Sequence, residues 1–182
     1  MGITDSLSIE SDDPGVLISA EALRDRVLSL GSALTARYVN RRPIFVIVLK
    51  GAMIFAADLV RGVPIEVELE FIHASSYGMG AQSDGTIEVI PSWTRPLTGR
   101  DVVIIEDIVD TGVTLHCIRA HIESQRPATI EACALLDKPG RRRVEVPLEY
   151  VGFQIEDVFA VGYGLDYAER FRNLPYIGVV NT

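Results

Sequence analysis

Residues 106–114 read Glu-Asp-Ile-Val-Asp-Thr-Gly-Val-Thr and combine two kinds of group that suit one ligand. From Asp110 to Thr114, small and hydroxyl-bearing residues occupy a turn before a helical pattern. Backbone N–H groups at such a turn, together with the positive end of the helix, favour bound phosphate. Glu106 and Asp107 cannot bind phosphate, but carboxylates suit sugar hydroxyls or a divalent cation. A phosphorylated sugar, with a diol at one end and phosphate at the other, fits the combination.

Each half of this segment also has a simpler structural explanation. Asp110 could act only as a helix N-cap, where aspartate is favoured. Glu106 and Asp107 could form a solvated strand end. Neither explanation accounts for both halves together, so we expect a binding site here.

Two other motif classes fail on their residue requirements. Aspartic proteases also carry Asp-Thr-Gly, but they need two such aspartates that share a proton. This chain has one Asp-Thr-Gly, at residues 110–112. A Walker phosphate loop ends in Gly-Lys-Ser or Gly-Lys-Thr, and the sequence contains neither.

The elements that must position this segment follow from the apolar pattern. Continuously apolar runs at residues 44–49 and 101–105 are typical of central parallel strands covered on both faces. Apolar residues recur at helical spacing after a possible N-cap at Ser19, and we expect helices at residues 20–39, 52–61 and around 115–122. Further strands are expected at residues 64–72, 86–91, 129–136, 151–155, 159–161 and 177–180. Helices alternating with apolar strands predict an α/β fold with an open, mainly parallel sheet flanked by helices.

Polar residues follow three of these apolar strands. Lys50-Gly51, Glu106-Asp107 and Lys138 each stand at a predicted strand end. Ligands of open α/β sheets bind beyond the carboxyl ends of the strands. We therefore expect these residues to meet at one edge of the sheet.

Composition limits the partners and the location. The chain has 182 residues, which fits one domain at 15–182 after a flexible, acidic tail at 1–14. Its net charge of −8 argues against general binding to nucleic acid or anionic membranes. Cys117 and Cys133 lie in apolar stretches without metal spacing, which indicates reduced, buried thiols. With no signal-peptide pattern and no apolar run near the roughly 20 residues of a membrane span, we expect a cytoplasmic protein.

The segment at residues 75–85 is rich in Gly, Ser and other small residues and separates two predicted strands. Loops of this length in compact domains are usually functional lids or disordered segments. Composition leaves both interpretations open.

The run from Val102 to Leu115 resembles the phosphoribosyl-pyrophosphate motif of the type I phosphoribosyltransferases, and the match narrows to the hypoxanthine-guanine phosphoribosyltransferases, particularly bacterial ones. Four other stretches carry this resemblance: residues 48–52 (Val-Leu-Lys-Gly-Ala), 75–78 (Ser-Ser-Tyr-Gly), 135–139 (Leu-Leu-Asp-Lys-Pro) and 151–179, which includes Gly-Tyr-Gly-Leu-Asp-Tyr at 162–167. Together they span about residues 16–180 in the family's order. The resemblance implies the type I fold, with a small hood formed by the terminal segments, and a homodimer or homotetramer.

For the sugar phosphate, the resemblance implies that Glu106 and Asp107 hold the ribose hydroxyls, partly through Mg²⁺. Asp110 is implied as the general base or acid at N7 of a purine. The implied 5′-phosphate cradle consists of Asp110, Thr111, Gly112, Val113 and Thr114. Val113 stands where relatives often carry a polar residue, but a cradle of backbone N–H groups does not depend on that side chain.

For the base, the resemblance implies that Lys138 donates to the oxygen at C6, Phe159 stacks on the ring and Ala160 contacts its edge through the main chain. Relatives more often carry valine at the position of Ala160. Asp166 is implied at the base site as the ligand of a second Mg²⁺. Without the resemblance, an exposed lysine, a core phenylalanine and a turn aspartate would be the better interpretations.

For pyrophosphate, the implied residues are Lys50, Gly51 and Arg172, and the Leu49–Lys50 peptide bond can be cis in the family. Ser76 and Tyr77 match the start of a mobile lid, whose closure would exclude water. Residues 141–143 are three consecutive arginines that could hold phosphate, although a solvated basic turn is at least as good an interpretation for two of them.

The implied reaction is purine salvage. The 5-phosphoribosyl group of phosphoribosyl pyrophosphate would pass to N9 of hypoxanthine or guanine, giving IMP or GMP and pyrophosphate, with Mg²⁺ required. Only small-molecule substrates are implied, with no nucleic-acid or membrane partner. The alternatives are a relative that uses xanthine or uracil, and a regulatory protein that keeps the fold and binds RNA. The net negative charge of the chain argues against RNA binding, and Lys138 together with Phe159 favours a purine as the base.

Overall fold

The computed structural model describes residues 14–76, 87–93 and 95–180. Within this part of the chain, the main sheet has six strands in the order β4-β3-β2-β5-β6-β7. The strands are parallel except for β4, which pairs antiparallel with β3. In chain order the elements are β1 Gly15–Ile18, α1 Ala20–Arg37, β2 Ile44–Leu49, α2 Met53–Arg61, β3 Glu68–Ser76, β4 Ile87–Pro91, β5 Asp101–Val109, α3 Val113–Glu123, β6 Thr129–Asp137, the 3-10 turn Pro139–Arg141, β7 Tyr150–Gln154, β8 Ala160–Val161 and β9 Ile177–Val179. The predicted open, mainly parallel α/β sheet is confirmed.

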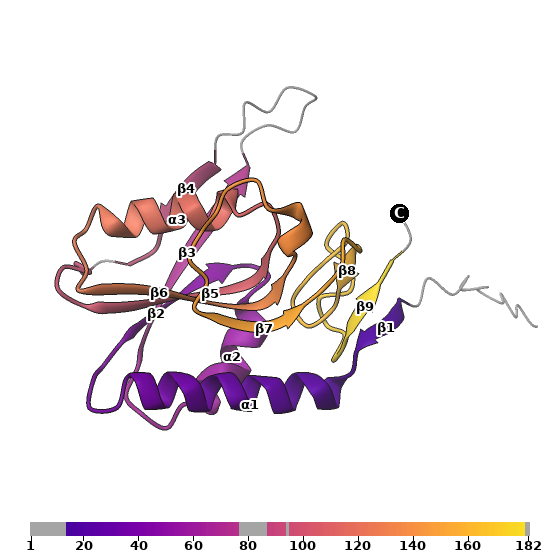
Figure 1. Ribbon diagram of the computed structural model, residues 1–182, viewed down its shortest axis with the longest axis horizontal. Coiled ribbons are helices and arrows are strands. Elements are labelled where there is room, and N and C mark those ends of the chain that lie inside the picture. Colours follow the sequence, from indigo (N-terminus) through magenta and orange to yellow (C-terminus); the bar gives the residue numbers. More distant parts are fainter. Residues whose placement is uncertain (1–13, 77–86, 94, 181–182) are drawn as a thin grey trace, which may run out of the picture.

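Helices cover both faces of this sheet, with α1 and α2 on one face and α3 on the other (Figure 1). Side chains alternate between the two faces of a strand, so the apolar run of β2 contributes to two cores. Phe45 and Ile47 pack in the core that contains α1 and α2. Val46 and Val48 pack in the core that contains α3. This double burial explains why the central strands are continuously apolar.

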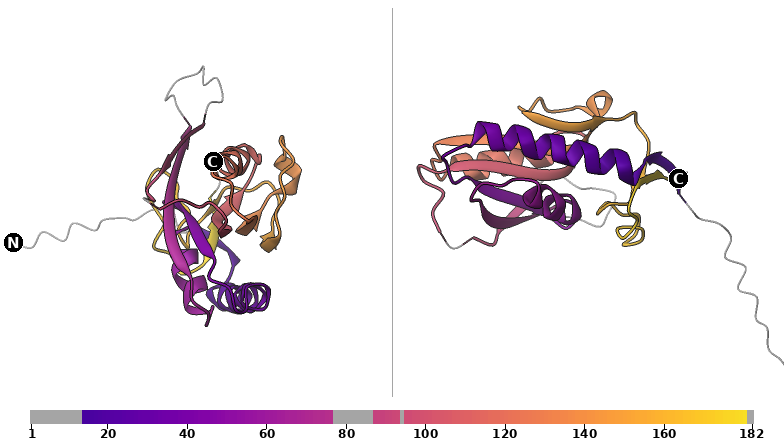
Figure 2. Two further views of the ribbon diagram at one scale, coloured as in Figure 1. Left: turned by 90° about the vertical axis from the view of Figure 1, so that its left-hand side faces the viewer. Right: turned by 90° about the horizontal axis from the view of Figure 1, so that it is seen from below.

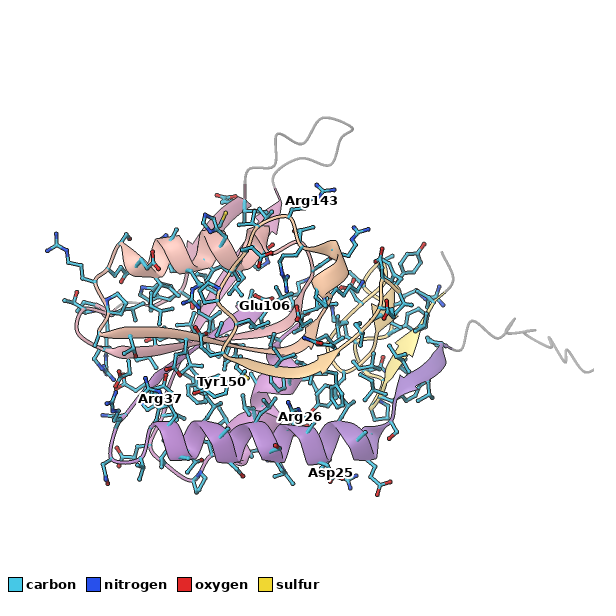
Figure 3. The ribbon with its side chains drawn as sticks, viewed as in Figure 1. Asp25, Arg26, Arg37, Glu106, Arg143 and Tyr150 are labelled. Atoms are coloured by element: carbon cyan, nitrogen blue, oxygen red, sulfur yellow. The ribbon has the colours of Figure 1, made fainter. Side chains whose placement is uncertain are left out.

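Helix α1 begins where the sequence predicted. The Ser19 hydroxyl accepts a hydrogen bond from the Ala22 N–H at 3.2 Å, as an N-cap does. Arg26 ties the middle of the helix to β7 by donating to the carbonyls of Val151 and Gly152. Figure 3 shows Arg37 and Tyr150 between α1 and the sheet, where both bind the carboxylate of Glu131. These contacts fix α1 against the far edge of the sheet.

A second, three-stranded sheet of order β1-β9-β8 lies at one end of the molecule. The view from below in Figure 2 shows β1 beyond one end of α1, where it pairs antiparallel with β9. Tyr163 and Leu165, from the loop after β8, are buried in the same core as α1 and α2. This sheet with its loops is called the hood below, and it confirms the hood predicted from the terminal segments. Pro14, the last residue of the predicted tail, is buried, and residues 1–13 lie outside the described part.

Two strands have boundaries that differ from the prediction by several residues. Strand β5 continues to Val109 instead of ending at Ile105, because β6 supplies ladder partners as far as Asp137. Strand β3 begins at Glu68 instead of residue 64, because its parallel partner β2 begins at Ile44, and it runs to Ser76 instead of residue 72, because β4 pairs with it that far. The first difference places the acid pair inside a strand.

Two further predictions concern the cysteines and membrane spans. Both cysteines are free; Cys133 is buried as predicted, but Cys117 is partly exposed. None of the described helices is long and apolar enough to cross a membrane.

Candidate active site

Two pockets share the residues at the end of β5. The first, called the turn pocket, has a volume of about 250 Å³ and is lined by Glu106, Asp107, Ile108, Val109, Asp110, Thr111, Gly112, Thr114 and Leu115. The second, called the hood pocket, also measures about 250 Å³ and is lined by Asp107, Ile108, Asp110, Lys138, Phe159, Ala160, Leu165 and Asp166. Asp107, Ile108 and Asp110 line both. A ligand with two unlike ends can therefore occupy both pockets at once.

The turn pocket ends at the N-terminus of α3. Gly112 is the N-cap residue with φ of +83° and makes no side-chain cap bond, and the Val113 N–H donates to Thr111 Oγ1 at 3.4 Å. A Cβ at this position would lie 2.3 Å from the carbonyl oxygen of Val144. Both the left-handed backbone and the close approach therefore require glycine. The start of α3 lines the turn pocket, an arrangement that suits an anion, and the N-cap residue is Gly112 and not Asp110.

The acid pair is not a solvated strand end. Glu106 is only 6% exposed, and its Oε2 atom has no hydrogen-bond partner among the described residues. Alternation along β5 places Glu106 with Ile104 on the α3 side of the sheet. Figure 3 shows Glu106 inside the molecule and Arg143 at its rim. A buried carboxylate oxygen without a partner is costly, which indicates that a bound group completes it.

Asp107 points toward the loop after β2. A Cβ on Gly51 would lie 1.6 Å from the Asp107 Oδ2 atom, so only glycine allows this approach. The other oxygen, Oδ1, accepts a hydrogen bond from the Ile108 N–H at 2.9 Å. The Leu49–Lys50 peptide bond that precedes this loop is cis. Gly51 thus lies against the acid pair, as the convergence of strand ends predicted.

The acid pair of Glu106 and Asp107 suits Mg²⁺ better than it suits a metal ion whose ligands all come from the protein. The described residues contain no group of three or more His, Cys, Asp or Glu side chains able to hold an ion. Mg²⁺ usually takes one or two carboxylates and completes its shell with water and substrate oxygens. Two adjacent carboxylates, one with an unpartnered buried oxygen, fit that requirement.

Burial raises the pKa of Glu106 well above its ordinary value of 4.5, and the neighbouring charge of Asp107 raises it further. A raised pKa in the folded state means that the charged carboxyl costs stability above about pH 4.5, increasingly so up to the folded pKa. Glu106→Gln stays neutral, so we expect it to stabilise the metal-free protein at pH 7 by about 1–3 kcal/mol. The gain should shrink as the pH falls and should vanish well below pH 4.5, where the native carboxyl is protonated in both the folded and the unfolded state. Thermal melting without metal at several pH values measures this.

The matched control for this prediction is Glu123→Gln, which removes the same charge at the exposed end of α3. It should leave the melting temperature nearly unchanged across the same pH range. Equal melting temperatures for Glu106→Gln and the native protein at every pH would contradict the prediction.

In the hood pocket an amine and an aromatic ring lie together. Lys138 is 8% exposed, and its Nζ atom lies 3.8 Å from Asp157. Phe159 is 42% exposed although it is apolar, and its ring meets the edge of Tyr167 at 5.3 Å between centroids. Ala160 is buried and pairs with β9. A half-exposed ring in a pocket, beside a buried donor, suits a flat heterocycle with an acceptor oxygen.

Asp110 lies where the two pockets meet. Its Oδ1 atom accepts a hydrogen bond from Arg141 Nε at 3.2 Å. Arg142 donates to the main-chain carbonyl of Asp110 and forms an ion pair with the buried Asp137. Of the three consecutive arginines, Arg142 therefore stabilises the turn through these two contacts, and Arg141 is the side-chain partner of Asp110. Arg143 is exposed.

Lys50 and Arg172 converge from the β2 loop and the hood. Arg172 pairs with Asp166 at 2.8 Å and donates to the carbonyl of Gly164 at 2.8 Å. Lys50 Nζ lies 3.2 Å from Glu169, and Arg172 contacts the same carboxylate oxygen at 3.4 Å. The second oxygen of Asp166 accepts from the Glu169 N–H. The two predicted pyrophosphate cations are thus brought together, with a carboxylate between them.

The predicted lid is only partly within the described residues. Ser76 is the last residue of β3 and pairs with Ile87 of β4. Tyr77 lies outside the described residues.

Sequence reasoning gave no role to four residues at the site, Ile108, Leu165, Asp157 and Glu169, and left the role of Arg141 open. Ile108 and Leu165 line the pockets, and their only signal was adjacency to Asp107 and Asp166 in the sequence. The ion-pair partners are Arg141, Asp157 and Glu169. Arg172 is three residues from Glu169, but the contacts with Lys50, Asp110 and Asp157 join residues 16 to 119 positions apart, so no local pattern indicates them.

Comparisons with known proteins agree with this geometry. Residues 20–168 match the phosphoribosyl transferase domain family. The chain is 42% identical to the hypoxanthine-guanine phosphoribosyltransferase of Bacillus subtilis over 172 residues, which are 94% of this chain and 96% of that protein. It is 44% identical to the bifunctional protein TilS/HprT of Listeria monocytogenes over 173 residues, or 95% of this chain, but it spans only 27% of that longer protein.

Among solved structures, a hypoxanthine-guanine phosphoribosyltransferase from Bacillus anthracis superposes with a TM-score of 0.86 and 42% sequence identity. The superposition covers 91% of this chain and 98% of that one. Sequence and fold agree over nearly the whole length. The chain belongs to the phosphoribosyl transferase family and, within it, to the hypoxanthine-guanine phosphoribosyltransferases.

Proposed function

We propose that this chain transfers the 5-phosphoribosyl group of phosphoribosyl pyrophosphate to N9 of hypoxanthine or guanine, producing IMP or GMP and pyrophosphate. The observation that carries the proposal is the meeting of the turn pocket and the hood pocket at Asp107, Ile108 and Asp110. One pocket ends in a helix N-terminus suited to phosphate, and the other holds an aromatic ring and a buried amine. Such a site holds a sugar phosphate and a base side by side, which lowers the entropic barrier to joining them.

The turn pocket binds the 5′-phosphate. Backbone N–H groups from Thr111 to Thr114 and the hydroxyls of both threonines surround the phosphate oxygens at the start of α3. Glu106 and Asp107 hold the ribose hydroxyls and one Mg²⁺, and Asp166 is the ligand of a second, directly or through water. When bound, Mg²⁺ neutralises the charge that develops on pyrophosphate as it leaves.

The hood pocket orients the base. Phe159 stacks on the purine, Lys138 donates to the oxygen at C6, and the main chain at Ala160 contacts the ring edge. The Lys138 ammonium can only donate hydrogen bonds. It therefore pairs with the oxygen of a 6-oxopurine but not with the amino group of adenine, which is itself a donor. This is the physical basis of the proposed base preference.

The bond to the pyrophosphate oxygen breaks at the anomeric carbon while the bond to N9 forms. Lys50 and Arg172 bind the departing pyrophosphate, and Asp110 accepts the proton from N7 of the base. Arg141 holds one oxygen of Asp110 in place from the side. The lid that starts at Ser76 and Tyr77 keeps water from competing for the anomeric carbon.

A base panel tests the proposed function. Hypoxanthine, guanine, xanthine, adenine and uracil are each incubated with phosphoribosyl pyrophosphate and Mg²⁺, and the nucleotide products are separated and quantified. We expect conversion of hypoxanthine or guanine, little reaction with adenine, and loss of activity with a chelator that added Mg²⁺ restores. Conversion of none of the 6-oxopurines would refute the proposal, and uracil turnover alone would assign a different base.

A further inference from the structure

One carboxylate, that of Glu169, stands between the two cations assigned to pyrophosphate. Its Oε1 atom lies 3.2 Å from Lys50 Nζ and 3.4 Å from Arg172 Nη2. Both distances are those of ion pairs, so this carboxylate is shared by the two cations. The ligand-free chain thus places an anion of its own where the leaving group's charge is proposed to bind.

The backbone holds Glu169 in this position. The Glu169 N–H donates to Asp166 Oδ2 at 2.8 Å. Ala168 and Glu169 have left-handed φ values of 50° and 63°, and Phe171 has a φ of 76°. Non-glycine residues rarely adopt this region, and such strain persists only where the surrounding structure enforces it. The turn between Asp166 and Arg172 therefore directs the Glu169 side chain to the cations.

The contacts of Glu169 can also be broken readily. Its side chain is 66% exposed and that of Lys50 is 60% exposed, so both can turn into water. Ion pairs as exposed as this one contribute little to stability. Arg172, in contrast, is only 26% exposed and keeps its hydrogen bond to the carbonyl of Gly164 when Glu169 leaves.

We propose that Glu169 is a built-in competitor of pyrophosphate: it occupies Lys50 and Arg172 in the free protein, must be displaced when pyrophosphate binds, and speeds the departure of this product. The proposal rests on the proposed function, because it assumes that Lys50 and Arg172 bind the leaving group. The alternative role, in which Glu169 positions the two cations for pyrophosphate, predicts the opposite effect on affinity.

Calorimetric titration of the free protein with Mg²⁺-pyrophosphate distinguishes these roles. Glu169→Gln keeps the shape of the side chain and removes its charge, so we expect it to bind pyrophosphate about three- to tenfold more tightly, with a correspondingly slower dissociation rate. Glu169→Ala should bind as tightly as Glu169→Gln. The difference from the native protein should shrink as salt is added, because screening weakens exposed charges.

Glu123→Gln is the matched control, since it removes one exposed carboxylate at the C-terminal end of α3, and it should bind pyrophosphate as the native protein does. Unchanged or weaker binding by both Glu169 variants, with melting temperatures near the native value, would overturn the competitor role. If the folded native protein fails to bind Mg²⁺-pyrophosphate at all, the proposed function fails instead. The two failures are thus separately recognisable.

Discussion

Asp110→Asn should lower kcat by roughly 10²–10⁴-fold, the range that general acid–base catalysis typically contributes. The substitution removes the carboxylate proposed to accept the N7 proton but keeps an oxygen able to accept the Arg141 hydrogen bond. Binding of phosphoribosyl pyrophosphate should change little, because the proposed phosphate cradle relies mainly on backbone N–H groups around the N-cap Gly112. Steady-state kinetics with hypoxanthine, together with titration of phosphoribosyl pyrophosphate, measures both effects.

Folding should be almost unaffected by this substitution. The Asp110 side chain is 38% exposed, and Arg141, at 45%, is exposed as well, so their ion pair adds little stability. We expect a melting temperature within about 2–4 °C of the native protein, which corresponds to roughly 1 kcal/mol for a chain of this size. Normal turnover in Asp110→Asn would remove its catalytic role, and a collapse in stability would show a structural role instead.

Lys138→Met should lower kcat/KM for hypoxanthine and guanine by roughly 10²–10⁴-fold, because a site built to donate to a substrate oxygen loses that donor. Methionine preserves an unbranched, flexible side chain of similar length. The ratio of hypoxanthine to adenine turnover should fall, since the ammonium that opposes the adenine amino group is gone. A base panel repeated on this variant measures the ratio.

The sequence offers a matched control for this second experiment. Lys50 and Lys138 are the only lysines in the chain; every other member of its 17 basic residues is arginine. Lys50→Met should weaken pyrophosphate binding and leave the base preference unchanged. Lys138→Met should change the base preference and leave pyrophosphate binding unchanged. An unchanged hypoxanthine-to-adenine ratio in Lys138→Met would contradict the proposed recognition of the base.

Several expectations from the sequence hold because they depend on local chemistry. Ser19 caps α1 because its hydroxyl reaches an N–H three residues later, a contact that sequence spacing alone specifies. The run from Ile44 to Leu49 forms a strand covered on both faces, as a continuously apolar run requires.

Other features depend on partners that are distant in the sequence. Ile105 was expected to end its strand because Glu106 and Asp107 are acidic, but β6 provides a ladder that extends β5 to Val109. As a result Glu106 is buried, and its pKa is raised, where a solvated strand end was a reasonable interpretation. Backbone pairing outweighs the low strand propensity of two acids, because propensity is weak compared with tertiary context.

The sequence by itself determined the α/β class, the turn at residues 110–114 that suits phosphate, and, through resemblance, the family to which the chain belongs. Only the tertiary structure decided that the turn pocket and the hood pocket share Asp110, that Arg141 is the partner of that aspartate, and that Glu169 bridges Lys50 and Arg172. The reason is physical: turns, caps and strand faces follow from neighbouring residues. Ion pairs and pocket walls join residues up to 119 positions apart, which only the packed sheet and hood bring together.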